Sequence, residues 1–341
     1  MARGSGRYSA GFDGGGTRTV CVIADHEGAV LGTGSSGPSN YITVGLESAQ
    51  ASIRASFKKA QTKAGLKGSR SSPDLFDVCL GLAGLDSPAA FRTMGRAIRG
   101  LGIAKNSIVV NDWLTALVGA FVDKPGVVLI AGTGCVAAGQ GAAASGKQGV
   151  VRVGGWGNVV DDRGSAYDIG RGALYAAMRA YDGRGPETAL LAALMRRLSV
   201  KEPQGIIERV YAKGMTPTEV ASLASLVSEA ASIGDEVSIR ILRERGRLLA
   251  ELVVTVASRL NLLERRFGVA LNGGAFNAGP PLLGPMWKEI RASAPSATQV
   301  RARLPPPFGA LLLIEKDPSS RRKLASRLER SMGHWAVENR Y

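Results

Sequence analysis

The feature that most constrains this chain is a strand–glycine turn–strand pattern that occurs once near the start of each half. The first copy reads GFDGGGTRTVCVIAD and the second reads VVLIAGTGCVAAGQ. Apolar runs on both sides of a glycine turn predict two strands, and not a strand followed by a helix. Because the pattern restarts in the second half, we expect a duplicated α/β domain.

The rest of the chain alternates strand and helix patterns, which is typical of mixed sheets flanked by helices. Helical spacing covers 46–64, 88–100, a segment from 115, 165–181, 186–199, 203–212, 216–232 and 235–264. We place the first domain at 1–122 with about 320–341, and the second at 123–319. Since no low-complexity linker divides the halves, we expect a tight cleft between the domains.

Composition narrows the function classes. The chain has 341 residues, enough for two domains. Its net charge of +15 comes from Lys and Arg spread along the chain, and only 6% of residues are aromatic, so we expect no nucleic-acid partner. No apolar run reaches the roughly 18 residues of a membrane span, and the N-terminus lacks the apolar segment of a secretory signal. We therefore expect a cytoplasmic protein that does not bind a membrane.

Cysteine and histidine usage indicates no metal cage. Cys21, Cys79 and Cys135 each lie in an apolar run, without CxxC or CxxH spacing. This pattern predicts buried free thiols and neither a disulfide framework nor a zinc site. His26 and His334 are too few for a His-based metal site.

The first turn consists of Asp13, Gly14, Gly15, Gly16 and Thr17. A strand follows it, so it is neither a Walker A loop nor a Rossmann turn, both of which lead into a helix. Glycines let backbone N–H groups approach a phosphate closely. The Thr17 hydroxyl can add a donor, and Asp13 can hold Mg²⁺ through water. A tight turn without a ligand would use the same residues.

Two further glycine turns extend this reasoning. The turn with Thr133 and Gly134 repeats the chemistry, and two such turns could hold the phosphates of one nucleotide. Gly273 and Gly274 follow the apolar strand VALN and could let adenine or ribose lie against the backbone. Each could also be an ordinary turn at the end of a strand.

Carboxylates follow two of the expected strands. Asp112 comes after SIVV, and the carboxyl ends of strands are where α/β proteins place reactive groups. In phosphoryl transfer an Asp accepts the proton of the attacking hydroxyl; the alternative is that Asp112 caps the next helix. Segment 154–167, GGWGNVVDDRGSAY, joins a Gly-flanked Trp to two carboxylates, which suits a sugar site, with a structural loop around a buried Trp as the alternative.

Taken in order, these motifs resemble the N-acetylglucosamine kinase family. The matching elements are DGGGT, SN at 39–40, ND at 111–112, AGTGC at 131–135, GGWG-x4-D-x-GSAY at 154–167 and NGG at 272–274. The resemblance implies an α/β fold of two actin-like (ribonuclease H-like) domains, each a mixed sheet flanked by helices, with an interdomain cleft. It also implies ATP and Mg²⁺ as cofactors, an amino sugar as substrate, and a homodimer.

The resemblance implies a role for each matching residue. Asp112 is the catalytic base that accepts the proton of the 6-hydroxyl of N-acetylglucosamine. The sugar-binding positions are Asn40, Asp112, Gly155, Trp156, Gly157 and Asp162. The nucleotide-binding positions are Gly14, Gly15, Gly16, Thr17, Thr133, Gly134, Gly273 and Gly274. Asp13 occupies the position associated with Mg²⁺.

One departure leaves the sugar open. The family's Gly-Asp-Glu-Gly-Ser reads Asp-Asp-Arg-Gly-Ser at 161–165. N-acetylglucosamine, glucosamine, glucose and N-acetylmuramate stay as alternatives, and the added carboxylate of Asp161 could favour cationic glucosamine.

Two rivals share the expected fold. Activator ATPases of 2-hydroxyacyl-CoA dehydratases and benzoyl-CoA reductases hold a [4Fe–4S] cluster through cysteines, and sugar-sensing regulators add a helix-turn-helix domain or a zinc motif. The scattered cysteines and the retained Asp112 favour a kinase.

Overall fold

The computed structural model describes residues 7–141, 149–212 and 214–332; His334 lies outside these ranges. The chain divides into two compact units: unit 1 contains the chain up to Pro125 and from Arg301, and unit 2 is Gly126–Val300. The expected domain limits stay a prediction. The compact units assign 301–319 to unit 1, because the helix α12 (Pro306–Ile314) packs against the first sheet and its helices.

Unit 1 is built on a five-stranded sheet in the order β3-β2-β1-β4-β5. Its strands are β1 (Tyr8–Gly14), β2 (Thr19–Asp25), β3 (Val30–Ser36), β4 (Phe76–Leu82) and β5 (Asn106–Asn111). The first three strands form an antiparallel meander, and β4 and β5 run parallel to β1. The predicted hairpin around the first glycine turn is therefore β1–β2.

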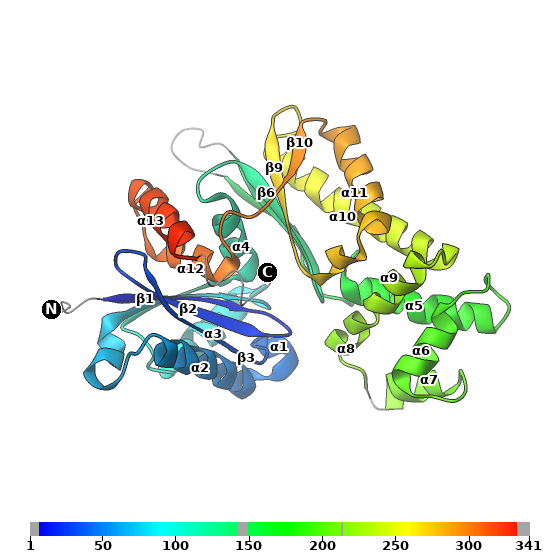
Figure 1. Ribbon diagram of the computed structural model, residues 1–341, viewed down its shortest axis with the longest axis horizontal. Helices are drawn as coiled ribbons and strands as arrows, with labels where there is room; N and C mark the ends of the chain where they lie inside the picture. The colour runs from blue at the N-terminus through cyan, green and yellow to red at the C-terminus, as the bar shows by residue number, and fades with distance from the viewer. Residues whose placement is uncertain (1–6, 142–148, 213, 333–341) are drawn as a thin grey trace. The chain divides into compact units, whose positions relative to one another are not determined.

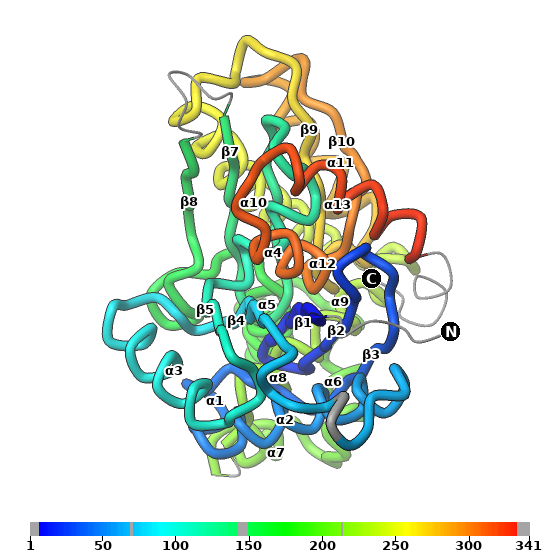
Figure 2. Tube along the Cα trace, turned by 90° about the vertical axis from the view of Figure 1, so that its left-hand side faces the viewer, coloured from blue at the N-terminus to red at the C-terminus, as the bar shows by residue number. Residues whose placement is uncertain are grey.

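Helices cover both faces of this sheet. They are α1 (Tyr41–Val44), α2 (Leu46–Lys63), α3 (Pro88–Gly100), α4 (Asp112–Phe121), α12 and α13 (Pro318–Ser331), with short 3₁₀ turns η1 (Gly68–Ser71) and η2 (Pro73–Leu75). Figure 1 shows α2 and α3 on one face, and Figures 1 and 2 show α4, α12 and α13 together on the other. The long helix α2 buries Ala49, Ile53, Phe57 and Ala60, a helical spacing that places one apolar stripe on the sheet.

Unit 2 repeats the strand order of unit 1. Its sheet, β10-β9-β6-β7-β8, is a meander followed by two parallel strands, as in unit 1. The strands are β6 (Gly126–Ala131), β7 (Cys135–Gln140), β8 (Val150–Gly154), β9 (Phe267–Asn272) and β10 (Ala297–Val300). The duplication expected from the two glycine turns is confirmed.

The helices of unit 2 agree with the prediction except near residue 223 and over 280–293, where the structure has a helix that the sequence analysis did not predict. They are α5 (Ala166–Tyr181), α6 (Leu190–Leu198), α7 (Gly205–Ile207), η3 (Glu208–Ala212), α8 (Pro217–Ser222), α9 (Ala224–Ser232), α10 (Glu236–Arg259), η4 (Gly274–Ala278) and α11 (Pro280–Ser293). The single helix expected over 216–232 is wrong: it breaks at Leu223, whose N–H bonds to the Val220 carbonyl three residues back. Gly170 of α5 packs against that same carbonyl, so the contact between helices coincides with the break.

Among the described helices, none combines the length and the apolar character needed to cross a membrane.

Candidate active site

The first glycine turn joins β1 to β2 as a tight hairpin. Gly14 pairs with Thr19, and the Gly15 N–H donates to the Arg18 carbonyl at 3.0 Å. Asp13 is half-buried at the end of β1, and Thr17 is exposed at the tip. Of the predicted phosphate-binding residues, Thr17 is exposed, Gly15 and Gly16 are half-buried, and Gly14 is buried.

The carbonyls of this turn hold two neighbouring loops in place. The Gly14 carbonyl accepts the Ala83 N–H at 2.9 Å, and the Gly15 carbonyl accepts the N–H groups of Ser39 (3.0 Å) and Asn40 (3.2 Å). The loop after β3 and the loop after β4 are therefore fixed to the turn by backbone hydrogen bonds, which do not depend on side-chain identity.

Asn40, a predicted sugar-binding residue, lies beside the loop after β4. Its side chain caps α1 by accepting the Ile42 N–H at 3.2 Å. Gly84 lies against it with a φ of 81°, and a Cβ there would be 2.5 Å from Asn40 Oδ1. Only glycine fits this position, both because of its φ and because of the contact.

Asp112 lies at the same edge of the sheet as the first turn. Gly14 pairs with Leu82, and Leu82 pairs with Asn111, so the three strands end in one row. Two strand spacings separate Gly14 from Asn111, about 10 Å. The Asn111 side chain donates to the Leu85 carbonyl at 2.8 Å, which connects this strand end to the loop after β4.

The helix-cap alternative for Asp112 is only partly correct. The N-cap position of α4 is Asn111, whose side chain makes no capping bond. Asp112 is the first helical residue, and its Oδ1 accepts the Trp113 N–H at 2.8 Å. Its carboxylate is half-buried at the helix N-terminus, where the macrodipole favours a negative charge.

The second glycine turn joins β6 to β7 in unit 2. Ala131 pairs with Cys135, and the Gly132 N–H donates to the Gly134 carbonyl at 2.9 Å. Thr133 is half-buried at the tip. A side chain added at Gly132 would meet no atom within 4 Å, so the backbone of this turn is open on that side.

Asp162 lies against this second turn. It is 6% exposed with a left-handed φ of 54°, and its Oδ1 accepts the Cys135 N–H at 3.3 Å. A Cβ at Gly134 would be 2.6 Å from Asp162 Oδ2. A residue assigned to the sugar and a residue assigned to the nucleotide are thus in direct contact.

The Trp156 loop leads from β8 to Asp162. Trp156 is 61% exposed, which makes the buried-Trp alternative wrong. The Arg152 guanidinium lies 4.9 Å from the centre of its ring and donates to the Gly154 and Gly155 carbonyls. Gly155 and Gly157 have φ values of 73° and 91°, a conformation that other residues rarely adopt.

Gly273 packs directly on the second turn. Its φ is 116°, and a Cβ there would lie 2.3 Å from the Ala131 carbonyl oxygen. Gly274 begins η4 and has no atom within 4 Å of its would-be Cβ. The loop after β9 therefore leaves open space beside Gly274 and none beside Gly273.

The sequence analysis did not identify two residues that lie beside the candidate site. Asp168 and Arg245 form a buried ion pair beneath the loop that carries Asp162. The spacing of Ser165 and Asp168 is the S-x-x-D pattern of a helix start, which could have drawn attention to Asp168. Arg245 carries no such signal, because it lies in the middle of the long helix α10.

The three cysteines are buried free thiols, as predicted. Burial raises the pKa of the Cys135 thiol well above its usual range, and the carboxylates of Asp162, Asp161 and Asp168 raise it further. Burial also raises the pKa of Cys79 to about 12. These groups are protonated and inert at neutral pH.

The donor set fits a nucleotide with a weakly held Mg²⁺. The open backbone at Gly132 and Gly274 leaves room for a ligand, and oxygen donors such as Asp13 are the type that Mg²⁺ prefers. Within the described ranges, no group of three His, Cys, Asp or Glu side chains could form a protein cage for a metal.

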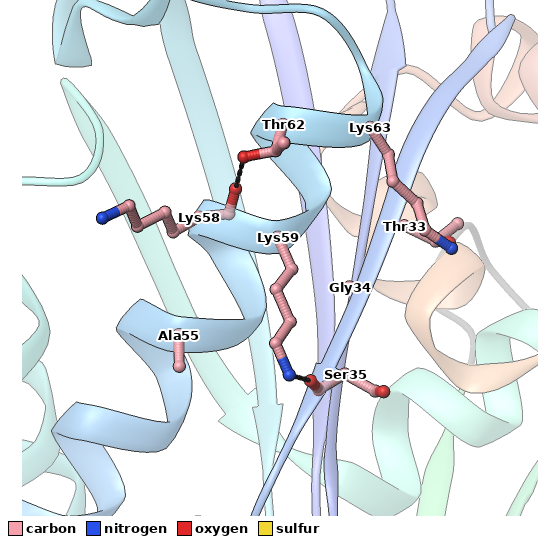
Figure 3. A pocket seen from close by; sticks show the side chains of 8 residues that line it. All are labelled: Thr33, Gly34, Ser35, Ala55, Lys58, Lys59, Thr62 and Lys63. Atoms are coloured by element: carbon pink, nitrogen blue, oxygen red, sulfur yellow. Dashed lines mark hydrogen bonds between the residues drawn. The ribbon is translucent and has the colours of Figure 1, made fainter.

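A pocket of about 600 Å³ between α2 and the edge strand β3 contains none of these residues. Figure 3 shows Lys59 and Lys63 reaching from α2 toward β3, while Lys58 points away. Lys59 donates to the Ser35 carbonyl at 2.8 Å, which protects an edge strand. Lys63 lies in the last turn of α2, where the helix dipole favours cations and disfavours an anionic ligand. We assign this pocket no ligand.

The sequence pattern of the BadF/BadG/BcrA/BcrD ATPase family matches residues 10–313. The chain belongs to this family. Among its curated relatives is the N-acetylmuramic acid/N-acetylglucosamine kinase of Clostridium acetobutylicum, 31% identical over 91% of this chain and 99% of the relative. Another is the N-acetyl-D-glucosamine kinase of Dictyostelium discoideum, 32% identical over 89% of this chain and 96% of the relative.

A solved structure has a similar fold. A candidate N-acetylglucosamine kinase from Chromobacterium violaceum is 25% identical, with a TM-score of 0.74, and the match covers 92% of this chain and 100% of that one. The predicted fold class, two actin-like domains each with a mixed sheet flanked by helices, is confirmed.

Proposed function

We propose that this protein is an ATP-dependent kinase that phosphorylates the 6-hydroxyl of N-acetylglucosamine. The observation that carries the proposal is the row formed by Gly14, Leu82 and Asn111, because it brings a glycine turn, Asp13 and Asp112 to one edge of a sheet. Two relatives named as N-acetylglucosamine kinases, aligned over nearly their full lengths, support the choice of sugar.

The proposed reaction uses few chemical groups. The Asp112 carboxylate accepts the proton of the 6-hydroxyl as that oxygen forms a bond to the γ-phosphorus and the bond to the ADP oxygen breaks. In this proposal Asn40, Asp162 and the loop of Gly155, Trp156 and Gly157 bind the sugar.

The remaining predicted residues serve the nucleotide. In the proposal, the glycine turns with Thr17, Thr133 and Gly134 bind its phosphates through backbone N–H and hydroxyl groups, and the Gly273–Gly274 turn contacts the adenosine. Asp13 would hold Mg²⁺ through water, and the metal would supply neutralisation of charge on the phosphate oxygens. The proposal includes the homodimer that the family resemblance implies and the cytoplasmic location expected from the sequence.

The cysteines favour a kinase over an activator ATPase. A cluster shared between subunits needs cysteines at a surface, whereas Cys21, Cys79 and Cys135 are buried in strands. A colourless purified protein would agree with this distinction, and a brown protein with bound iron would contradict it.

The test is ATP-dependent phosphorylation of N-acetylglucosamine, glucosamine, glucose and N-acetylmuramate, with phosphate position read by NMR. We expect the highest kcat/KM for N-acetylglucosamine. Asp112→Asn should lower kcat by about 10²–10⁴ while sugar binding survives, the usual contribution of a positioned general base. Asp74→Asn, at an exposed carboxylate just before β4, is the control and should act like wild type. Near-normal turnover by Asp112→Asn would refute the role of Asp112.

A further inference from the structure

A buried carboxylate lies beneath the loop that carries Asp162. The side chain of Asp168, in the first turn of α5, is 3% exposed. Its Oδ2 accepts the Gly164 N–H at 3.1 Å and lies 3.2 Å from Nε of Arg245, which comes from α10. Its Oδ1 accepts from Arg171 at 3.0 Å. One carboxylate therefore joins the loop to two helices.

The buried charges of Asp168 and Arg245 need a physical explanation. A buried ion is costly unless it is paired. Each member of this pair has one further partner on a more exposed side chain: Arg171 for Asp168, and Glu244, 2.8 Å away, for Arg245. Arg245 is only 15% exposed and lies mid-helix, so its charge does not serve the helix dipole. Gly164 presses the loop onto the same helix: its φ is 100°, and a Cβ there would lie 2.8 Å from the Leu249 side chain.

The far side of the loop is fixed to the second glycine turn. Asp162 accepts the Cys135 N–H at 3.3 Å, and the Ala166 N–H donates to the Gly132 carbonyl at 2.8 Å. The Cys135 thiol donates to the Arg163 carbonyl at 3.3 Å, so the loop covers this thiol. The loop thus connects the turn on one side to the Asp168–Arg245 pair on the other.

We propose that Asp168, paired with Arg245, is a positioning residue for the second glycine turn. It fixes the loop 162–166 through the Gly164 N–H, and the loop in turn fixes the backbone around Thr133. The consequence for ATP rests on the proposed function, whereas the mechanical coupling between Asp168 and the turn does not.

The first test measures the coupling without activity. Asp168→Asn keeps the side-chain size but removes the charge, so we expect the loop to open and Cys135 to react with a thiol reagent about tenfold faster or more. Cys21 and Cys79, buried in unit 1, are internal controls and should stay protected. Labelling sites are assigned by mass spectrometry. Cys135 protected as in wild type would overturn the proposal.

Matched variants separate positioning from general unfolding. Arg171→Gln removes a partner of the same carboxylate whose side chain is 56% exposed, and it should label like wild type. If Asp168→Asn exposes all three cysteines, the double variant Asp168→Asn/Arg245→Met separates local opening of the loop from general unfolding. It does so because it removes both buried charges and leaves neither of them unpaired. Selective labelling of Cys135 in the double variant supports the proposal, and protection of Cys135 there overturns it.

The second test links the pair to the nucleotide. In the phosphorylation assay, Asp168→Asn should raise the KM for ATP about tenfold, because the disturbed turn is assigned to phosphates. It should also raise the KM for the sugar, because the loop that opens carries Asp162. A wild-type protein that phosphorylates no sugar would refute the proposed function and leave the labelling result standing. An active Asp168→Asn variant with rapid Cys135 labelling but an unchanged KM for ATP would refute the link to the nucleotide.

Discussion

Substitution of the neighbouring glycines Gly273 and Gly274 by alanine tests the packing of the loop after β9. The same change should destabilise the protein at Gly273 and leave its stability almost unchanged at Gly274. Gly273 has φ 116° and ψ 157°, a region used almost only by glycine, so Ala there costs about 1–3 kcal/mol of backbone strain. Its Cβ would also lie 2.3 Å from the Ala131 carbonyl oxygen, and overpacking costs about 1–3 kcal/mol more. Gly273→Ala should therefore lose about 2–6 kcal/mol.

Gly274→Ala is the matched control. No atom lies within 4 Å of the added methyl group, and its stability should stay within about 0.5 kcal/mol of wild type. Urea unfolding followed by circular dichroism measures the free energy of unfolding of both variants. For a unit of this size, the stability lost in Gly273→Ala corresponds to a thermal unfolding midpoint about 4–24 °C lower. Equal stability of the two variants would refute the reasoning. If Gly274 contacts the nucleotide, its variant should still bind ATP more weakly.

The other predictions concern residues assigned to the sugar and the N-cap of α10. Gly84→Ala should push Asn40 aside and lower kcat/KM for the sugar by about 10–100-fold, as measured by steady-state kinetics, with an unchanged value counting against the contact. Asp161→Gly should lower the ratio of glucosamine to N-acetylglucosamine turnover, and an equal ratio would show that this carboxylate does not select the sugar. Burial raises the pKa of Asp235, but hydrogen bonds from Ala189, Ser238 and Thr188 outweigh it and lower the pKa below its ordinary value. The stability that its charge contributes is therefore full above about pH 4 and is lost as the pH falls further, so Asp235→Asn, which keeps the cap, should converge with wild type in acid-unfolding curves.

The sequence was most informative where a residue type has a local geometric meaning. Two glycine turns between apolar runs predicted two hairpins, and the structure has β1–β2 and β6–β7 in those places. The predicted boundary between the helical ranges 216–232 and 235–264 coincides with Gly234, whose φ is left-handed, and with Asp235, which caps α10. In each case the signal is contained in a few adjacent residues.

The sequence was least informative where contacts join distant segments. The contact of Gly273 with Ala131 and the pairing of Asp168 with Arg245 depend on tertiary packing, which a single sequence does not record. The same holds for Leu223, where the sequence predicts a continuous helix but the helix breaks beside its contact with α5. Only an observed fold could reveal that Asp162 touches the second turn.

The backbone hydrogen bonds that join the first turn to the loops after β3 and β4 have a consequence for how this family changes its substrates. Because the carbonyls of Gly14 and Gly15 determine where Ala83, Ser39 and Asn40 lie, adding or deleting a residue in any of these loops would displace all of them together. New sugar preferences should therefore arise by exchange of side chains on loops of constant length. In directed evolution of this protein, point-mutation libraries should outperform libraries of loop insertions.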